Sequence, residues 1–176
     1  RLTPGAVLAL LVADSPEAVG PLLKQLAIPD CRADALLFLP SLRRVAHPGV
    51  GRGAAEHGDF AARPLDRLRA TLTYVYCVTY GTPAEIRAVA ANVTGAHRMV
   101  AGPGYRASDP DLQLWVAATL YDTALLVYQE LFGRLDPAIA DNVYSQYAVL
   151  GTALQVPSGM WPADRAAFGT YWQHHI

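Results

Sequence analysis

The most constraining feature of this sequence is a repeated signal for the start of a helix: a proline with a hydrogen-bond acceptor side chain close by. Proline is tolerated at the first helical position because its missing N–H would have no partner there, and the nearby oxygen caps a free backbone donor. The signal occurs in DSPEA (14–18), TPAE (82–85), SDPD (108–111), LDPA (135–138) and WPAD (161–164). Gly81, Gly102 and Gly133 follow periodic segments and supply the matching helix ends.

Apolar residues between these signals recur at helical spacing, which predicts an all-α fold in a compact single domain over residues 1–176, globin-like in packing style only. The predicted helices, about seven, are 16–27, 33–45, 65–80, 83–101, 110–132, 137–154 and 162–174. The β-prone stretch YVYCVTY (74–80) continues a helical pattern, and no convincing strand pair is found. The glycine-rich segment 46–64 is predicted to be a loop.

Composition excludes some classes of function. Hydrophobic residues make up 52% of the chain and charged residues 16%, with a formal net charge of −1. Without a basic surface, nucleic-acid binding is not expected. No run of eighteen apolar residues occurs, so no transmembrane segment is expected either. Cys31 and Cys77 do not form a disulfide framework, which favours reduced thiols and a cytoplasmic location, although a chain that starts at Arg1 leaves its natural N-terminus open.

His97 is the first candidate site residue. It lies on the apolar stripe of the predicted helix 83–101, and therefore projects from the side that faces the core. A neutral imidazole in that position must satisfy two ring nitrogens. Three roles stay open from this pattern alone: a hydrogen-bonded core residue, a general base, or an axial metal ligand.

Arg67 and Thr71 are four residues apart and share one face of the predicted helix 65–80, which continues to Tyr74. Together they could hold an anionic group or steer bound oxygen, and an arginine that extends to the surface is an equally good reading. His47, Glu56, His57 and Asp59 gather in the segment 46–64. Their spacing matches no common metal-binding pattern, so HPGVG (47–51) is predicted to form turns.

Three stretches in order resemble the family of latex-clearing proteins (rubber oxygenases) and MpaB-type oxygenases. They are HPGVGRGAAEHGDFAARPLDRLRATLTYVYCVTYGT (47–82), VTGAHRMVAG (93–102) and YRASDPDLQLWVAATLYDTALLVYQ (105–129). The resemblance covers roughly 47–171 and implies an all-α fold that binds haem b, with His97 as the axial ligand of the iron. It further implies that Arg67 holds a haem propionate or an oxygen species across the pocket, with Thr71 as a hydrogen-bond donor.

Two departures from the family pattern bear on the substrate. Rubber-cleaving members have a lysine before the threonine that serves as a second iron ligand, and this chain has Ala70 there, so polyisoprene is not the expected substrate. Family chains also run further on both sides, so pocket walls are expected to be missing or to come from another subunit of a homo-oligomer.

The resulting hypothesis is a haem b-dependent oxidoreductase that uses O2 to oxidise an apolar isoprenoid-like or polyketide-like molecule, as in secondary metabolism. Tyr74, Tyr105 and Trp115 are candidate pocket walls, although aromatic residues at such spacing usually belong to the core. Two alternatives stay open. One is a haem-free family member, such as a cyclase, isomerase or hydratase, with His97 as the base. The other is a non-enzymatic module that binds an apolar ligand.

Overall fold

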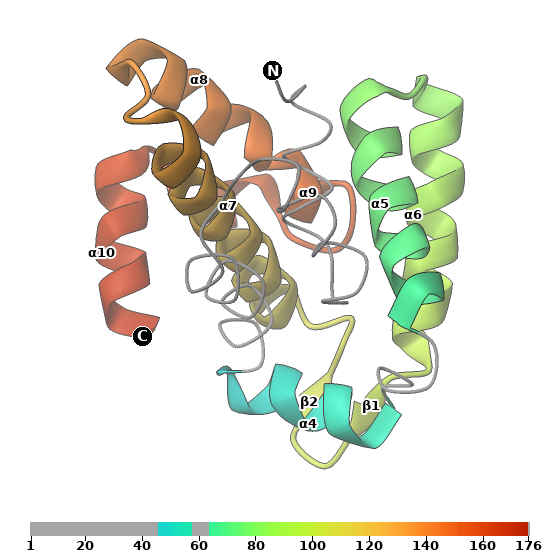
Figure 1. Cartoon of the computed structure of the whole chain (residues 1–176). Coiled ribbons are helices and arrows are strands. Elements are labelled where there is room, and N and C mark those ends of the chain that lie inside the picture. The colour runs from blue at the N-terminus through green and yellow to red at the C-terminus, as the bar shows by residue number, and fades with distance from the viewer. Residues whose placement is uncertain (1–45, 58–63, 176) are drawn as a thin grey trace.

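The computed structural model describes residues 46–57 and 64–175, and within them the fold is predominantly α-helical, as predicted (Figure 1). The helices are α4 (Pro48–His57), α5 (Pro64–Tyr80), α6 (Pro83–Arg98), α7 (Pro110–Phe132), α8 (Pro137–Tyr147), α9 (Val149–Thr152) and α10 (Arg165–His175), with a 3-10 turn at Ser158–Met160. The predicted helices 16–27 and 33–45 lie outside the described residues. No described helix has the length and apolar content needed to cross a membrane.

Most helix starts are confirmed at the predicted caps. Thr82 and Glu85 form a reciprocal capping box on α6, and Asp109 and Asp136 accept backbone N–H groups at the starts of α7 and α8. The predicted start at Pro162 is wrong. The helix begins three residues later, because the Asp164 carboxylate accepts a hydrogen bond from the Ala167 N–H at 2.7 Å and thereby caps α10.

The segment predicted to be a loop contains a helix, α4, so the predicted turns at HPGVG are wrong. Gly49 and Gly53 are one helical turn apart and buried. A Cβ atom at Gly49 would lie 3.1 Å from Leu112 Cδ2, and one at Gly53 would lie 3.3 Å from Tyr105 Cε2. The glycines therefore let α4 approach its neighbours closely, and this packing outweighs their low helix propensity.

A small hairpin replaces the end of the helix predicted to reach residue 101. Helix α6 ends at Arg98, and β1 (Ala101–Gly102) pairs antiparallel with β2 (Tyr105–Arg106). Gly104 turns the chain with φ of +80°, a conformation that glycine adopts freely. A Cβ atom at Gly102 would lie 2.6 Å from the Tyr105 ring, so only glycine fits under that ring. The expectation that no strands pair is therefore wrong for this short segment, where two residues of each strand pair.

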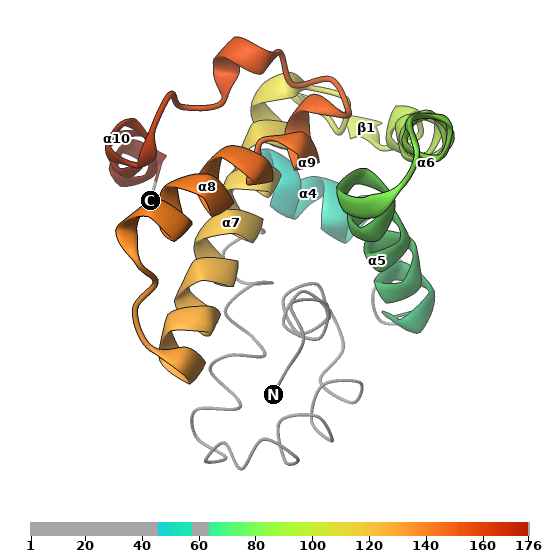
Figure 2. The ribbon, with the colours of Figure 1, turned by 90° about the horizontal axis from the view of Figure 1, so that it is seen from above.

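Helices α5 and α6 form an antiparallel hairpin on one side of the molecule, and the long helix α7 crosses beneath α8 on the other (Figures 1 and 2). Seen from above, α9 lies between these two groups and α10 lies beyond α8 (Figure 2). Buried residues of α5, α7, α8, α9 and α10 form a continuous hydrophobic core. The hairpin is thus joined to the rest of the structure largely through α9.

Aromatic rings connect α7, α8 and α10. Tyr121 makes edge-on contacts with Tyr144 and Phe168, at ring-centroid distances of 5.1 and 4.9 Å. Trp172 continues this packing by stacking on Trp115 at 5.5 Å. Edge-on and offset arrangements of this kind add to the stabilisation that burial provides.

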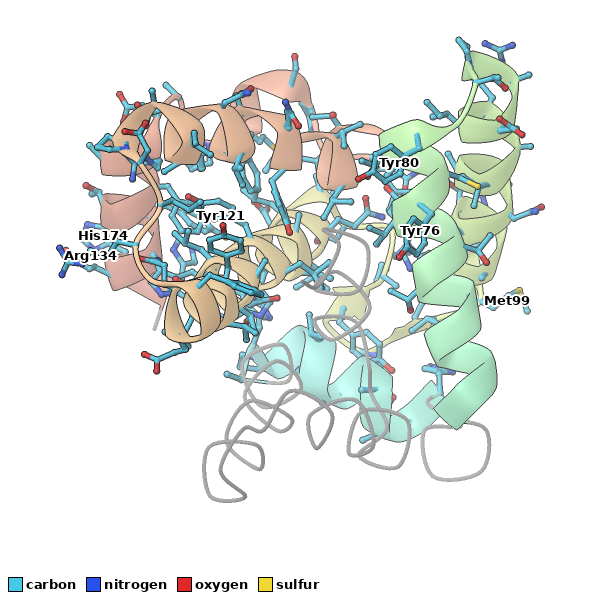
Figure 3. All side chains as sticks on the ribbon, turned by 45° about the horizontal axis from the view of Figure 1, so that its top comes forward. Tyr76, Tyr80, Met99, Tyr121, Arg134 and His174 are labelled. Atoms are coloured by element: carbon cyan, nitrogen blue, oxygen red, sulfur yellow. The ribbon has the colours of Figure 1, made fainter. Side chains whose placement is uncertain are left out.

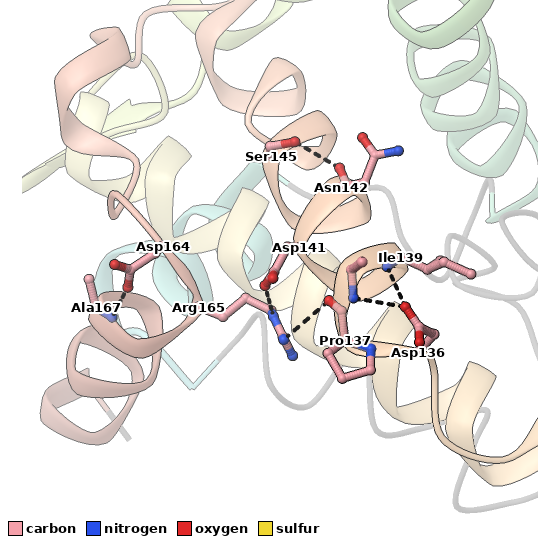
Figure 4. Close-up of polar contacts among 10 residues, drawn as sticks. Asp136, Pro137, Ile139, Asp141, Asn142, Ser145, Asp164, Arg165 and Ala167 are labelled. Carbon is pink, nitrogen blue, oxygen red and sulfur yellow. Dashed lines mark hydrogen bonds and ion pairs between the residues drawn. The ribbon is translucent and has the colours of Figure 1, made fainter.

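Polar contacts hold the outer edge of the same group of helices (Figure 4). The Arg165 Nε atom of α10 lies 2.6 Å from Asp141 Oδ1 of α8, and the same guanidinium reaches the Pro137 carbonyl. Because this ion pair is largely exposed to solvent, it sets the orientation of the two helices more than it stabilises them.

Candidate functional site

His97 lies in the last turn of α6 and its imidazole is half-buried. Its Nδ1 atom is 3.5 Å from the Nε2 atom of Gln113, a buried residue of α7. The predicted position on the inner side of α6 is therefore consistent with the structure, and the imidazole faces a polar group there rather than purely apolar atoms.

The orientation of the Gln113 amide is fixed by backbone groups. Its Nε2 donates to the Ala107 carbonyl at 2.9 Å, and its Oε1 accepts the Gln155 N–H at 2.9 Å. Gln113 Nε2 also donates to Gln155 Oε1 at 2.6 Å, and Gln155 Nε2 donates to Thr94 Oγ1 at 2.9 Å. These residues, the His97 network, link α6, α7 and the segment after α9 through buried or half-buried hydrogen bonds.

The hydrogen bonds of Gln113 limit the interaction that its amide can make with the His97 ring. An amide nitrogen has two hydrogens, and both of those on Gln113 point to acceptors closer than the His97 ring. The long contact to Nδ1 therefore does not fix the protonation of the ring. It places Nδ1 on the side of the network and leaves Nε2 on the opposite edge of the imidazole.

Removing the Gln113 amide is expected to destabilise the fold. In Gln113→Ala, the Gln155 N–H and the Ala107 carbonyl lose their partner, and each unsatisfied buried group costs about 1–3 kcal/mol. We expect the free energy of unfolding, measured in urea, to fall by about 2–4 kcal/mol. Gln129→Ala on the same helix is the control, because among the described residues the Gln129 side chain bonds only to the Leu125 carbonyl within α7. Equal losses in both variants would show that the network is not a structural link.

Arg67 and Thr71 belong to the first half of α5, and the antiparallel hairpin brings this half alongside the last turns of α6. The backbone at Arg67 and Thr71 therefore lies at the same end of the hairpin as His97. Thr71 is half-buried and Ala70 is exposed, whereas the Arg67 side chain is outside the described atoms. The predicted roles of Arg67 and Thr71 stay predictions.

The three predicted pocket walls are buried and make specific contacts. The Tyr74 hydroxyl donates to the Leu150 carbonyl at 2.7 Å, and burial raises its pKa above the ordinary value. The Tyr105 hydroxyl donates to Glu56 Oε2 at 2.5 Å, and this hydrogen bond is the main cause of its raised pKa. Trp115 is 2% exposed and its ring contacts His47 and Trp172. Their roles as pocket walls stay predictions.

His47 caps the start of α4, and His57 and Glu56 at its end contact the β1–β2 hairpin. His47 Nδ1 accepts the Gly49 N–H at 3.1 Å, and the His57 ring lies 3.1 Å from the Ala101 carbonyl. Glu56 accepts from Tyr105, and Asp59 lies outside the described residues. Across the described part of the chain, no three His, Cys, Asp or Glu side chains come close enough to bind a metal ion.

A large cavity lies between α5, α7, α8 and α9, with a volume of about 1010 Å³. On α5 its lining consists of residues from Val75 to Tyr80, in the half of the hairpin away from His97. Neither His97 nor Thr71, Tyr74, Tyr105 or Trp115 belongs to the described lining. Sequence analysis did not find this cavity, because its walls come from four helices and no local motif marks it.

Comparison with known proteins identifies the family. The family described as ER-bound oxygenase mpaB/B'/Rubber oxygenase, catalytic domain, matches residues 35–176. The chain belongs to this oxygenase family. The match confirms the resemblance inferred from the motifs.

Relatives of this oxygenase-family chain occur in mycobacteria. The uncharacterized protein Rv2237 of Mycobacterium tuberculosis and the uncharacterized protein Mb2261 of Mycobacterium bovis are each 42% identical to it over 152 residues. The match covers 80% of this chain and 60% of each relative, so the chain spans about three-fifths of their length. No solved structure matches it.

Proposed function

We propose that the chain is the helical core of a haem b-dependent oxygenase that uses O2 to oxidise an apolar, isoprenoid-like or polyketide-like substrate. The observation that carries the proposal is His97, a half-buried imidazole in the last turn of α6, in a chain of an oxygenase family. In this proposal His97 would hold the haem iron.

The donor set around His97 fits haem better than a bare metal ion. Haem supplies its own equatorial nitrogens, so the protein needs to add only an axial ligand, and one helix-borne imidazole suffices. A bare ion needs several protein ligands, and the described residues do not bring three suitable side chains together. Gln113 contacts the Nδ1 edge of the ring, and Nε2, a common ligating nitrogen, is the atom that would bind the iron in this proposal.

With haem bound, His97 would hold the iron and the Arg67 guanidinium would pair with a propionate or with oxygen in the pocket. Thr71 would donate a hydrogen bond from the same face of α5. Bound haem would supply the capacity to bind and activate O2. Ala70 provides no second protein ligand where rubber-cleaving members have lysine, which favours a substrate other than polyisoprene. The single-domain and homo-oligomer expectations belong to the same proposal.

The test is an absorption spectrum with an iron assay, on protein expressed with a haem precursor. We expect a Soret band and stoichiometric iron. A colourless, iron-free protein that shows the expected helical circular dichroism would overturn the haem proposal. In that case, turnover that depends on His97 would indicate a general base, and ligand binding without turnover would indicate a binding module.

A further inference from the structure

The cavity between α5, α7, α8 and α9 has the walls of a site for an apolar ligand. Its volume of about 1010 Å³ is at the upper end of the range of about 300–1,000 Å³ that is usual for small-molecule sites. Aliphatic side chains contribute much of the wall, among them Val78, Leu125, Val143 and Leu150. An apolar molecule would lose contact with water on entering and would gain the corresponding free energy.

Exposed apolar side chains gather at the same cavity. Tyr80, Phe132 and Ile139 are 67%, 47% and 53% exposed, and all three line it. They come from α5, from the end of α7 and from α8, and Figure 3 shows Tyr80 on α5 with Tyr121 on α7 on the other side. Large apolar residues exposed around one opening are typical of a place where apolar ligands enter.

Tyr147 is one of the polar residues in this largely apolar wall. It lines the cavity, and its ring packs edge-on against Tyr121 at 5.4 Å. Burial raises the pKa of its hydroxyl, so the group is a neutral donor at physiological pH. The hydroxyls of Tyr74, Tyr105 and Tyr144 donate to protein acceptors, whereas that of Tyr147 has no hydrogen-bond partner among the described residues.

We propose that this cavity binds an apolar molecule with an oxygen acceptor such as a ketone, and that the acceptor takes a hydrogen bond from the Tyr147 hydroxyl. The Tyr147 hydroxyl donates to no described protein group, and a ligand carbonyl in the cavity would supply an acceptor. The apolar substrate class comes from the proposed function. The location of the site, the need for an oxygen acceptor and the role of Tyr147 are inferred from the cavity and its lining.

The test uses the iron-free protein, so that its outcome is separate from that of the haem assay. The probe is 2-tridecanone, a long-chain methyl ketone, titrated by calorimetry. We expect saturable binding to the unaltered protein and about fivefold weaker binding to Tyr147→Phe, the loss that one neutral hydrogen bond causes. Tyr171→Phe, which removes a hydroxyl from α10 outside the cavity lining, is the matched control and should bind as the unaltered protein does.

A second variant tests the location. Ala124 is 6% exposed and lines the cavity, so Ala124→Leu should fill part of the space and weaken binding at least tenfold, while circular dichroism reports whether the helices persist. Absence of binding to the unaltered protein would overturn the proposal. So would equal affinities of Tyr147→Phe and the unaltered protein. A negative iron assay with positive ketone binding would reject haem and leave this cavity site standing.

Discussion

Replacing His97 with alanine is expected to abolish the Soret absorption and remove the iron from protein expressed with a haem precursor. His97 is the proposed axial ligand, and haem that loses this bond keeps only non-covalent contacts with its pocket. Alanine has a high helix propensity, so α6 should persist. Added imidazole should restore part of the Soret band by replacing the missing side chain.

His57→Ala is the matched control for this experiment. His57 is a helix-borne histidine whose ring lies against the Ala101 carbonyl, and it has no place in the proposed iron site. We expect His57→Ala to keep its iron, with at most a small loss of stability. The proposal would be contradicted if His97→Ala kept full iron content and an unshifted Soret band. Urea unfolding of both variants separates loss of the ligand from loss of the fold.

The elements that could be predicted from the sequence are those whose signals are local. The caps at Thr82, Asp109 and Asp136 act within one helical turn, so each start is visible in four residues. Helix α4 could not be predicted in this way. Its glycines disfavour helix locally, and the compensating contacts of Gly49 and Gly53 come from Leu112 and Tyr105, more than fifty residues along the chain.

In the candidate site, too, some residues are marked by a local sequence signal and others are brought together only by folding. His97 could be singled out because its helical stripe is otherwise apolar, whereas Gln155 reaches this helix only through the folded chain. Gln113 carried a signal that was not used, since a glutamine within the apolar run LQLWVAATL of 112–120 must find buried partners. The cavity had no such signal, because Val75, Tyr121 and Tyr147 become neighbours only when α5, α7 and α8 pack together.

Trp115→Ala is expected to lower the free energy of unfolding by about 3–5 kcal/mol, as truncation of a large buried aromatic side chain usually does. Trp115 is 2% exposed, stacks on Trp172 of α10 and contacts His47 beside α4. Its loss would leave a void where three segments meet. Met99→Ala is the control, because Met99 is 78% exposed and its truncation should change stability by less than about 0.5 kcal/mol.

Trp115→Ala and Trp115→Phe together show whether Trp115 is a core residue or a wall of the haem pocket. If Trp115 is a core residue, Trp115→Ala should lose stability measured in urea, and Trp115→Phe should recover much of it by keeping a ring against Trp172. Iron content, measured below the unfolding transition, should then match that of the unaltered protein. If instead Trp115→Ala lost its iron while its unfolding free energy changed by less than about 1 kcal/mol, the stacking with Trp172 would be incidental. The residue would then belong to the wall of the haem pocket.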